Sequence, residues 1–279
     1  MREQPFFGLY TPRLPSAQGQ NSRLQNITNI VIFVMQVPLE EGTYKKAGLF
    51  MTGRDLRDAR RKKGWTQEET AEKLGVTQAY LSMLESGRRS MPSTLARLAV
   101  ETLHAPPTAL PLHTQAVETP PGSEKVSLQL AALGYPGFAH LRAKARRNPA
   151  EVLLTALHAA NLDNRVTEGL PWLALAYADM DWDWVVPNAK LLDRQNRLGF
   201  VVTLASQLAS KSTDPHRSAR LKEYAAVLER SRLAKEDTLC HDSLTEAERK
   251  WLRAHRPATA AHWNLLTDMK AENLPHATL

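Results

Sequence analysis

Residues 66–87 read TQEETAEKLGVTQAYLSMLESG, a pattern typical of two short helices that follow one another closely. Thr66 is a favourable N-cap residue, and Glu69, three positions later, completes a capping box. Gly75 can adopt the left-handed conformation that ends a helix. The first half of the stretch therefore predicts a helix over residues 67–74.

The second half predicts another helix almost at once. Thr77 caps it, and it extends over residues 78–86 and ends at Gly87. Because so few residues separate the two helices, they must cross steeply, at roughly 90–120°. Close crossing requires a small residue on the first helix, and Ala71 supplies it. We expect the shared core to contain Leu56, Leu74, Leu81 and Leu84.

This stretch, extended to residue 89, resembles the helix-turn-helix of the Cro-like phage-repressor family, often called Xre-type. It carries that family's Gln, Ala, Gly, capping Thr, apolar and Glu-x-Gly positions in order. The resemblance covers residues 52–103, about a fifth of the chain. It implies an all-α, five-helix domain with helices at residues 53–63, 67–74, 78–86 and 93–103, and a fifth helix that the proline-rich residues 105–112 shorten or abolish.

In such a domain the second helix of the motif lies in the major groove of DNA, with its N-terminal residues on base edges. Gln78 directly follows the cap, and its amide can both donate to and accept from adenine. Ala79 is small enough to contact a thymine methyl group, and Met83 lies one turn further on. Tyr80 and Ser82 point toward the flanks, where phosphates lie. Because many relatives carry polar residues in place of Ala79 and Met83, direct base readout is expected to rest largely on Gln78.

Contacts with the DNA backbone follow from the same resemblance. It implies that the side chain of Gln67 and the N-terminus of its helix meet a phosphate. The full set of candidate DNA-binding residues is Thr66, Gln67, Thr77, Gln78, Ala79, Tyr80, Ser82, Met83, Ser86, Arg88 and Arg89.

Three further features of this segment have structural interpretations. The resemblance implies that Glu85 forms a buried ion pair with Arg60, and we favour that role over a contact with DNA. Trp65 is interpreted as a cap on the core. The basic run at residues 60–63 fits two interpretations equally well: a solvated helix end, where cations suit the helix dipole, or additional neutralisation of phosphate.

The composition of the chain agrees with a nucleic-acid partner. With 279 residues, two domains are the default expectation, and 43% hydrophobic residues suffice for their cores. A formal net charge of +7 and a pI near 9.6 favour an acidic partner, though only mildly. The single cysteine, Cys240, excludes an intrachain disulfide framework or a thiolate zinc site and fits a reducing cytosol. No apolar run approaches the ~20 residues of a membrane helix.

The sequence predicts an N-terminal extension, a DNA-binding domain over residues 51–104, a linker and a larger helical domain. Residues 1–50 lack a clear pattern, so we expect a disordered or non-native extension, with Met51 as the natural start. The apolar run at residues 30–35 fits either the core of a signal peptide without a clear cleavage site or a lone strand. Five prolines make residues 105–123 a linker.

Residues 124–279 predict an all-α domain that dimerises, senses a signal or binds a partner. Helix-start signals recur along it, at Asn148, Asp163, Asp181, Asp214 and, as a capping box, Ser243 with Glu246.

Several patterns in this domain invite a functional interpretation that we weigh against a structural one. The alternating acids of residues 179–184 lack the glycine and distal Glu of a calcium loop, so helix capping with buried aromatics is favoured. Cys240, His241 and Asp242 are adjacent in sequence and therefore do not predict a catalytic triad. The basic residues between positions 140 and 147 predict an ordinary surface helix, with contact to flanking DNA or an acidic partner as the alternative.

The sequence thus favours a sequence-specific transcription regulator, most simply a repressor that reads a palindromic operator as a homodimer through residues 78–86. The alternative is an antitoxin or phage-defence regulator whose C-terminal domain captures a partner protein, for which the Trp-rich residues 170–184 offer apolar side chains. We expect no enzymatic activity, no cofactor, no metal and no membrane partner. The partners expected are double-stranded DNA, a second copy of the chain, and a partner protein or small-molecule effector at residues 124–279.

Overall fold

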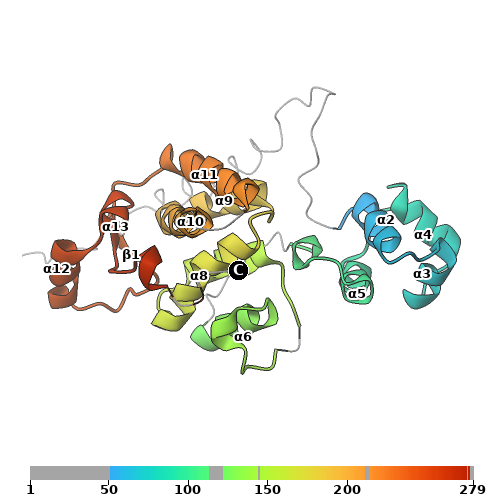
Figure 1. Cartoon of the computed structure of the whole chain (residues 1–279), viewed down its shortest axis with the longest axis horizontal. Helices are drawn as coiled ribbons and strands as arrows, with labels where there is room; N and C mark the ends of the chain where they lie inside the picture. The colour runs from blue at the N-terminus through green and yellow to red at the C-terminus, as the bar shows by residue number, and fades with distance from the viewer. Residues whose placement is uncertain (1–50, 113–121, 144, 211–213, 275, 277–279) are drawn as a thin grey trace, which may run out of the picture. The chain divides into compact units, whose positions relative to one another are not determined.

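The computed structural model describes residues 51–112, 122–143, 145–210, 214–274 and 276. The expected N-terminal extension and the apolar run within it lie outside these residues, as do residues 113–121 of the expected linker. The described residues are mostly helical, with a helix-turn-helix domain followed by further helices (Figure 1). None of the described helices is both long and apolar enough to cross a membrane.

Four α-helices and one short 3-10 turn build the N-terminal domain, in the order predicted. They are α2 (Gly53–Lys62), α3 (Gln67–Lys73), α4 (Gln78–Glu85), α5 (Ser93–Leu103) and η1 (Pro107–Ala109). Each α-helix ends within one residue of its predicted end. The fifth helix that the resemblance implies is reduced to η1, because prolines cannot donate the backbone hydrogen bonds of an α-helix.

The helix ends follow from local chemistry. Thr66 and Glu69 form the predicted capping box, with Thr66 Oγ1 accepting from the Glu69 amide at 3.1 Å and Glu69 Oε2 accepting from the Thr66 amide at 2.7 Å. Thr77 Oγ1 accepts from the Tyr80 amide at 3.2 Å. Gly75 has a φ of 65°, in the left-handed region that favours glycine. Together these caps fix the short turn between α3 and α4.

A second capping box begins α2 and was not predicted. Thr52 Oγ1 accepts from the Asp55 amide at 3.1 Å, and Asp55 Oδ2 accepts from the Thr52 amide at 2.9 Å. The start of α2 packs directly on the end of α4, so that a Cβ atom at Gly53 would overlap the backbone carbonyl of Leu84. Only glycine fits at this position.

The core of the N-terminal domain contains the four predicted leucines. Ala71 is also buried, at the close crossing of α3 and α4. Met51 is buried in the same core, with 3% of its surface exposed. Among the described residues, the buried hydrophobic members of this core are Met51, Leu56, Ala71, Leu74, Leu81, Leu84, Ala96, Ala99, Val100, Leu103, Ala105 and Leu110.

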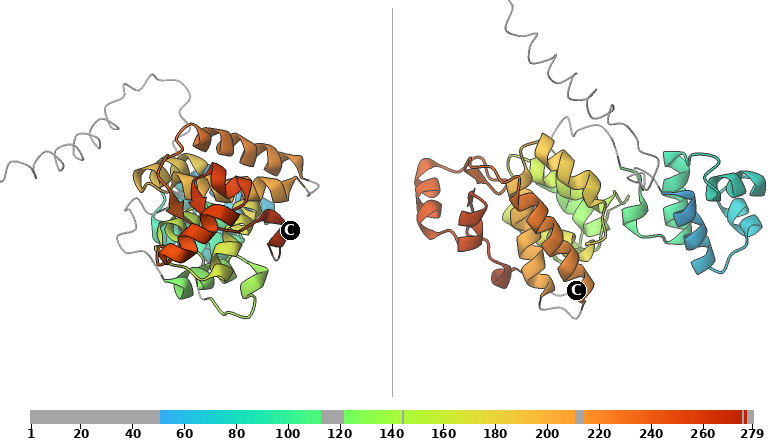
Figure 2. Two further views of the ribbon diagram at one scale, coloured as in Figure 1. Left: turned by 90° about the vertical axis from the view of Figure 1, so that its left-hand side faces the viewer. Right: turned by 90° about the horizontal axis from the view of Figure 1, so that it is seen from above.

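The described residues from 122 onward form a larger helical region around a core of their own. Its elements are α6 (Ser123–Ala132), η2 (Pro136–Phe138), α7 (Pro149–His158), α8 (Asn164–Ala176), α9 (Trp182–Leu191), α10 (Gln195–Ala209), α11 (Pro215–Glu229), α12 (Glu246–His255), α13 (Ala258–His262) and η3 (Ala271–Asn273). Helix α10 is central: it packs against α7, α8, α9, α11 and α13. Figure 2 shows α11, in orange, alongside α10.

One small pair of strands accompanies the helices of this mostly helical region. Strands β1 (Asp237–Thr238) and β2 (Leu265–Leu266) form a parallel pair, with Asp237 opposite Leu265. Each strand has only two residues, too few to give an alternating pattern that a sequence reading can detect. The pair joins the segment before α12 to the segment after α13.

Most of the predicted helix starts in this region are present. The side chains of Asn148, Asp181 and Asp214 accept hydrogen bonds from backbone amides at the first turns of α7, α9 and α11. Asp163 precedes α8 but makes no such side-chain bond. The capping box predicted at Ser243 is wrong: Thr245 caps α12, with Glu248 as its partner.

The basic segment before α7 is also not the surface helix expected. Beyond η2 its described residues are non-helical. The Gln129 side chain accepts from the Arg147 amide at 3.1 Å and donates to the Ala145 carbonyl at 3.4 Å. Arg146 donates to the Ala132 carbonyl at 3.1 Å. The two bonds with Gln129 satisfy backbone groups of the segment that a helix would otherwise have satisfied internally.

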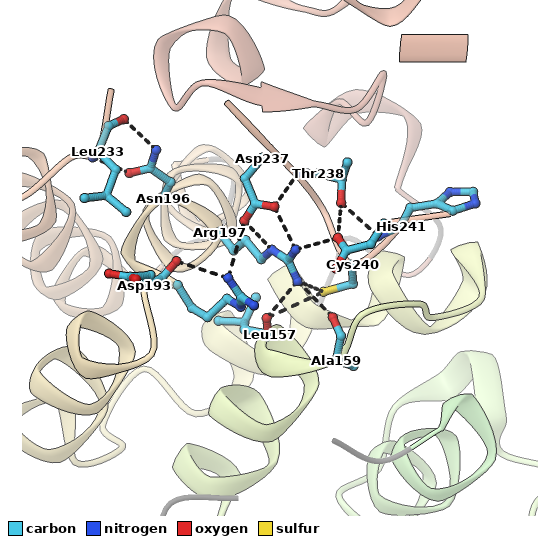
Figure 3. A network of polar contacts seen from close by, with 12 residues as sticks. Leu157, Ala159, Asp193, Asn196, Arg197, Leu233, Asp237, Thr238, Cys240 and His241 are labelled. Carbon is cyan, nitrogen blue, oxygen red and sulfur yellow. Dashed lines mark hydrogen bonds and ion pairs between the residues drawn. The ribbon is translucent and has the colours of Figure 1, made fainter. Parts of the chain in front are cut away.

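A buried arginine holds several separate segments of this region together (Figure 3). Arg197 of α10 exposes 1% of its side chain. It forms a two-pronged ion pair with Asp237, at 2.7 and 2.8 Å, and donates to Asp242 at 2.9 Å. It also donates to the backbone carbonyls of Leu157 and Ala159, at 3.1 and 2.8 Å. One side chain thus links α10, the end of α7 and the segment around β1.

Candidate nucleic-acid interface

Helix α4 divides its residues between the core and the solvent. Leu81, Leu84 and Glu85 are buried, whereas the opposite side of the helix faces outward. Among the candidate DNA-contacting residues of α4, Gln78, Ala79 and Ser82 are exposed, and Tyr80 and Met83 are half-buried. The side predicted to meet base edges is therefore open to a partner.

The amide of Gln78 is held in place by a chain of hydrogen bonds that reaches into the domain. Gln78 Nε2 donates to Gln67 Oε1 at 3.2 Å, and Gln67 Nε2 donates to Glu85 Oε2 at 2.9 Å. Glu85 is in turn bound by Arg60. This arrangement leaves the Gln78 carbonyl oxygen and its second N–H free for a base edge, which is the pairing that adenine requires.

The residues that the resemblance pairs, Arg60 and Glu85, form a two-pronged ion pair. Arg60 Nε lies 2.6 Å from Glu85 Oε1, and Arg60 Nη2 lies 3.1 Å from Glu85 Oε2. The Glu85 side chain is fully buried, and 12% of the Arg60 side chain is exposed. Arg57 joins them, 3.6 Å from the carboxylate.

Opposing effects act on the pKa of Glu85. Burial works to raise it, since desolvation disfavours the charged form. The hydrogen bonds from Arg60 and Gln67, together with the charges of Arg60 and Arg57, outweigh burial and hold the pKa of Glu85 below its usual value. Glu85 therefore stays ionised at neutral pH, and its charge is neutralised inside the domain rather than projected toward DNA.

The candidate phosphate-binding residues lie on the surface of the same domain. Thr66, Ser86, Arg88 and Arg89 are exposed, and Gln67 is half-buried. Neither Arg88 nor Arg89 has an ion-pair partner among the described residues. Two guanidinium groups next to the end of α4 are thus free to neutralise an anion.

The hydroxyls of Thr66 and Thr77 already accept backbone hydrogen bonds as caps, but both remain exposed. Their contribution to any contact would come from the remaining hydrogen-bonding capacity of each hydroxyl. Ser86 donates to the Met83 carbonyl at 3.2 Å. These three hydroxyls are therefore weaker candidates for phosphate than the two arginines.

Trp65 and the basic run at residues 60–63 are the other features of this domain that the sequence singled out. Trp65 packs against the core, as interpreted from the sequence, and the Lys73 ammonium lies 4.9 Å from its ring centre. The basic run forms the last turn of α2 and its C-cap. Arg60 is used internally, whereas Arg61 and Lys62 are exposed and suit either role proposed for the run.

Sequence reasoning missed two determinants of this surface. The contact between Gln67 and Gln78 escaped it because the two residues lie eleven positions apart on different helices. Gly53 was recognised as a helix start, but the reason for glycine there was not. The contact joins Gly53 to Leu84, which lies far away in sequence, so it left no local signal.

In the C-terminal region, the structure favours structural roles for residues 179–184 and for Cys240 over metal binding or catalysis. Asp181 caps α9, and Trp182 is buried with 1% of its surface exposed, as expected for residues 179–184. The Cys240 thiol is buried and donates to the Ala156 carbonyl at 3.3 Å, while the exposed His241 points away from the Arg197 network (Figure 3). Among the described residues, no three His, Cys, Asp or Glu side chains gather as metal ligands would.

The tryptophans that suggested a protein-binding surface are mostly in the core. Trp172 and Trp182 expose 7% and 1% of their surfaces. Trp182 stacks on Tyr224 with a centroid distance of 5.0 Å, and its indole N–H donates to the Ala178 carbonyl. Their apolar surface is used within the fold and offers little to a partner.

Comparison with known proteins supports the assignment of the N-terminal domain. Residues 56–102 match the model of a family described as helix-turn-helix, of the Cro-like, Xre type. No curated protein and no solved structure matches the chain. The matched domain implies DNA binding, and domains of this kind are typical of non-enzymatic regulators.

Proposed function

We propose that the protein is a sequence-specific transcriptional repressor that reads a palindromic operator as a homodimer. The observation that carries the proposal is the exposed N-terminal half of α4, with the Gln78 amide held by Gln67 in an orientation that suits a base edge. Blocking access to a promoter is the simplest way in which such a protein acts.

Base readout would rest on the first residues of α4. Gln78 pairs with adenine through its free carbonyl oxygen and N–H, and Ala79 contacts a neighbouring thymine methyl group. Gln78 donates to Gln67, which in turn donates to Glu85, so the Gln78 side chain is fixed before binding and little rotamer entropy is lost when the complex forms. Preorganisation of this kind favours one base over the others.

Backbone contacts would supply most of the affinity. Arg88 and Arg89 are exposed cations beside α4, and each phosphate they neutralise releases counterions from the DNA. One domain covers one half-site, so a palindrome with half-sites about one helical turn apart requires two copies of the chain. Pairing of two chains is therefore part of the proposal.

The test begins with DNA fragments that the purified full chain retains at moderate salt, which are sequenced to give the operator. Gln78→Ala should then weaken binding to the operator by about 1–3 kcal/mol and relax the preference at one base position of each half-site. Gln207→Ala, an exposed glutamine on α10, is the matched control and should bind like the unchanged chain.

A second variant separates backbone contacts from base readout. Arg88→Ala should weaken binding to all sequences alike and reduce the salt dependence, the slope of log K against log salt, by about 1. An operator without symmetry would contradict the dimer, and a Gln78→Ala variant with unchanged sequence preference would contradict the proposed docking of α4.

A further inference from the structure

A cavity of about 410 Å³ lies in the C-terminal region, far in sequence from the DNA-binding helices. Its walls come from α8, the segment 239–244, α12 and the segment 266–274. Its volume lies within the roughly 300–1,000 Å³ typical of small-molecule sites. None of its residues takes part in the proposed DNA contacts, so DNA binding does not account for the cavity.

The charged side chains of this cavity are mainly acidic. Glu168, Glu248 and Asp268 line it, against the one cation Lys270 and the imidazole of His241. Glu168 and Asp268 have no ion-pair or hydrogen-bond partner among the described residues. Lys270 already pairs with Glu272, at 3.8 Å. In a chain with a formal net charge of +7, two free carboxylates in one hollow form a local site for positive charge.

The rest of the lining mixes polar and apolar side chains and includes an exposed aromatic ring. Trp251 of α12 exposes 52% of its surface, although large aromatic side chains are usually buried. One face of its indole stacks on His255, with 4.5 Å between ring centroids. An aromatic face beside carboxylates is suited to an organic cation, since the ring attracts positive charge and buries the attached carbon atoms. The buried apolar lining residues are Leu239, Leu252, Leu266 and Leu274.

The wall that contains Leu239 and His241 is held rigidly. Asp237 and Asp242 flank this segment, and both are bound by Arg197. Thr238 Oγ1 adds a hydrogen bond to Asp242 at 2.7 Å and accepts one from the His241 amide at 3.2 Å. A wall fixed in this way keeps its shape without a ligand, as ligand sites usually do.

We propose that this cavity binds a small organic cation, with an ammonium group at Glu168 and Asp268 and an apolar body against Trp251. The carboxylates supply charge recognition, and the leucines with the indole supply apolar contact. Binding at this site does not depend on the DNA-binding proposal, and either can fail without affecting the other.

Phenethylamine is a suitable probe, because its uncharged isostere 2-phenylethanol differs only in the ammonium group. Calorimetric titration of the full chain at about pH 8, where the amine of phenethylamine is protonated, should show saturable binding of phenethylamine. The dissociation constant of 2-phenylethanol should be higher by about tenfold or more. Equal affinity for both compounds, or no binding of phenethylamine, would overturn the proposal.

Variants locate the site on the surface of the chain. The double variant Glu168→Gln with Asp268→Asn should weaken binding of phenethylamine by about tenfold or more, and Trp251→Ala should also weaken it. Glu223→Gln, at an exposed carboxylate on α11 outside the cavity, and Leu191→Ala, at an exposed apolar residue on α9, are the matched controls. Unchanged affinity in the double variant would refute the assignment of the ammonium group.

Discussion

Glu85 combines two roles in a single side chain. It neutralises Arg60 within the domain, and through Gln67 it fixes the amide of Gln78 on the surface. A buried charge is costly unless its partner and hydrogen bonds compensate it, and here one of the compensating contacts, the hydrogen bond from Gln67, also shapes the candidate DNA surface. Changes at Glu85 should therefore affect both stability and DNA recognition.

Glu85→Gln should destabilise the N-terminal domain by about 3 kcal/mol, because it leaves the guanidinium of Arg60 largely buried without its counter-charge. Glu72→Gln, at an exposed carboxylate on α3, should change the stability by less than about 0.5 kcal/mol. Urea titrations of the full chain, followed at the amide NMR signals of Leu81 and Leu84, measure both. Equal stability of the two variants would mean that the ion pair contributes nothing.

The same residue predicts a dependence of stability on pH. The pKa of Glu85 is lower in the folded domain than in the unfolded chain, where it is about 4.3. Its contribution is therefore fully present above about pH 4.3 and is lost as the pH falls toward the folded pKa. The same titrations, repeated between neutral pH and about pH 3, should show a smaller loss of stability in Glu85→Gln than in the unchanged chain. If the two proteins lost the same stability as the pH fell, Glu85 would not be the source of the pH dependence.

At the scale of elements, the contact between α2 and α4 depends on one missing side chain. Gly53→Ala would normally stabilise the helix by about 0.5–1 kcal/mol. Here we expect the opposite sign, with a loss of about 1–3 kcal/mol, because the new methyl group overlaps the Leu84 carbonyl. Hydrogen exchange of the α2 and α4 amides in the full chain measures the change.

A second glycine provides the comparison for that experiment. Gly122, the N-cap of α6, has an ordinary backbone conformation, and no atom lies within 4 Å of where its Cβ would be. Gly122→Ser should be neutral or stabilising, since serine is a better N-cap than glycine. If Gly53→Ala is also neutral or stabilising, α2 and α4 do not pack as described.

The helices whose ends are fixed by hydrogen bonds between residues close in sequence were predictable. Thr66 with Glu69, Gly75 and Thr77 determine the boundaries of α3 and α4 through bonds to near neighbours, so their spacing alone places both helices. The start of α12 was not decided locally. Ser243 and Thr245 each precede a glutamate by three positions, and the Ser243 amide is taken by Asn161, which lies far away in sequence.

At the scale of the whole molecule, one residue of α10 connects segments about forty positions apart. Arg197→Met should destabilise the C-terminal region by about 3–5 kcal/mol, because Asp237 and Asp242 lose their shared cation and two buried carbonyls lose their donor. Hydrogen exchange should report the loss in α7, α8 and α10 and leave α2–α5 unchanged, because the two regions have separate cores.

The matched control for that variant is Arg230→Met, an exposed arginine at the end of α11 without an ion pair among the described residues. It should be neutral within about 0.5 kcal/mol. Loss of protection in α2–α5 as well would show that the two cores unfold as one unit.

The Arg197 network could not have been predicted from the sequence. A single arginine among apolar residues indicates a buried partner, but its carboxylates follow about forty residues later, in and just after β1, and nothing in the spacing selects Asp237 and Asp242 over other acids. The cavity that includes Leu239 and His241 was hidden for the same reason. The candidate DNA surface lies within one compact motif, whereas this cavity is lined by four separate segments of the chain, from α8 to residue 274.

Cys240 carries the only thiol of the chain, and it lies sealed against α7 beside Arg197. Burial raises the pKa of this thiol to about 11, against the opposing influence of the Arg197 charge, so that neither access nor ionisation favours attack by an alkylating reagent. Modification at neutral pH must therefore wait for the surrounding structure to open. The rate at which iodoacetamide labels the native protein therefore reports how often that structure opens, and loss of the Arg197 side chain should raise this rate.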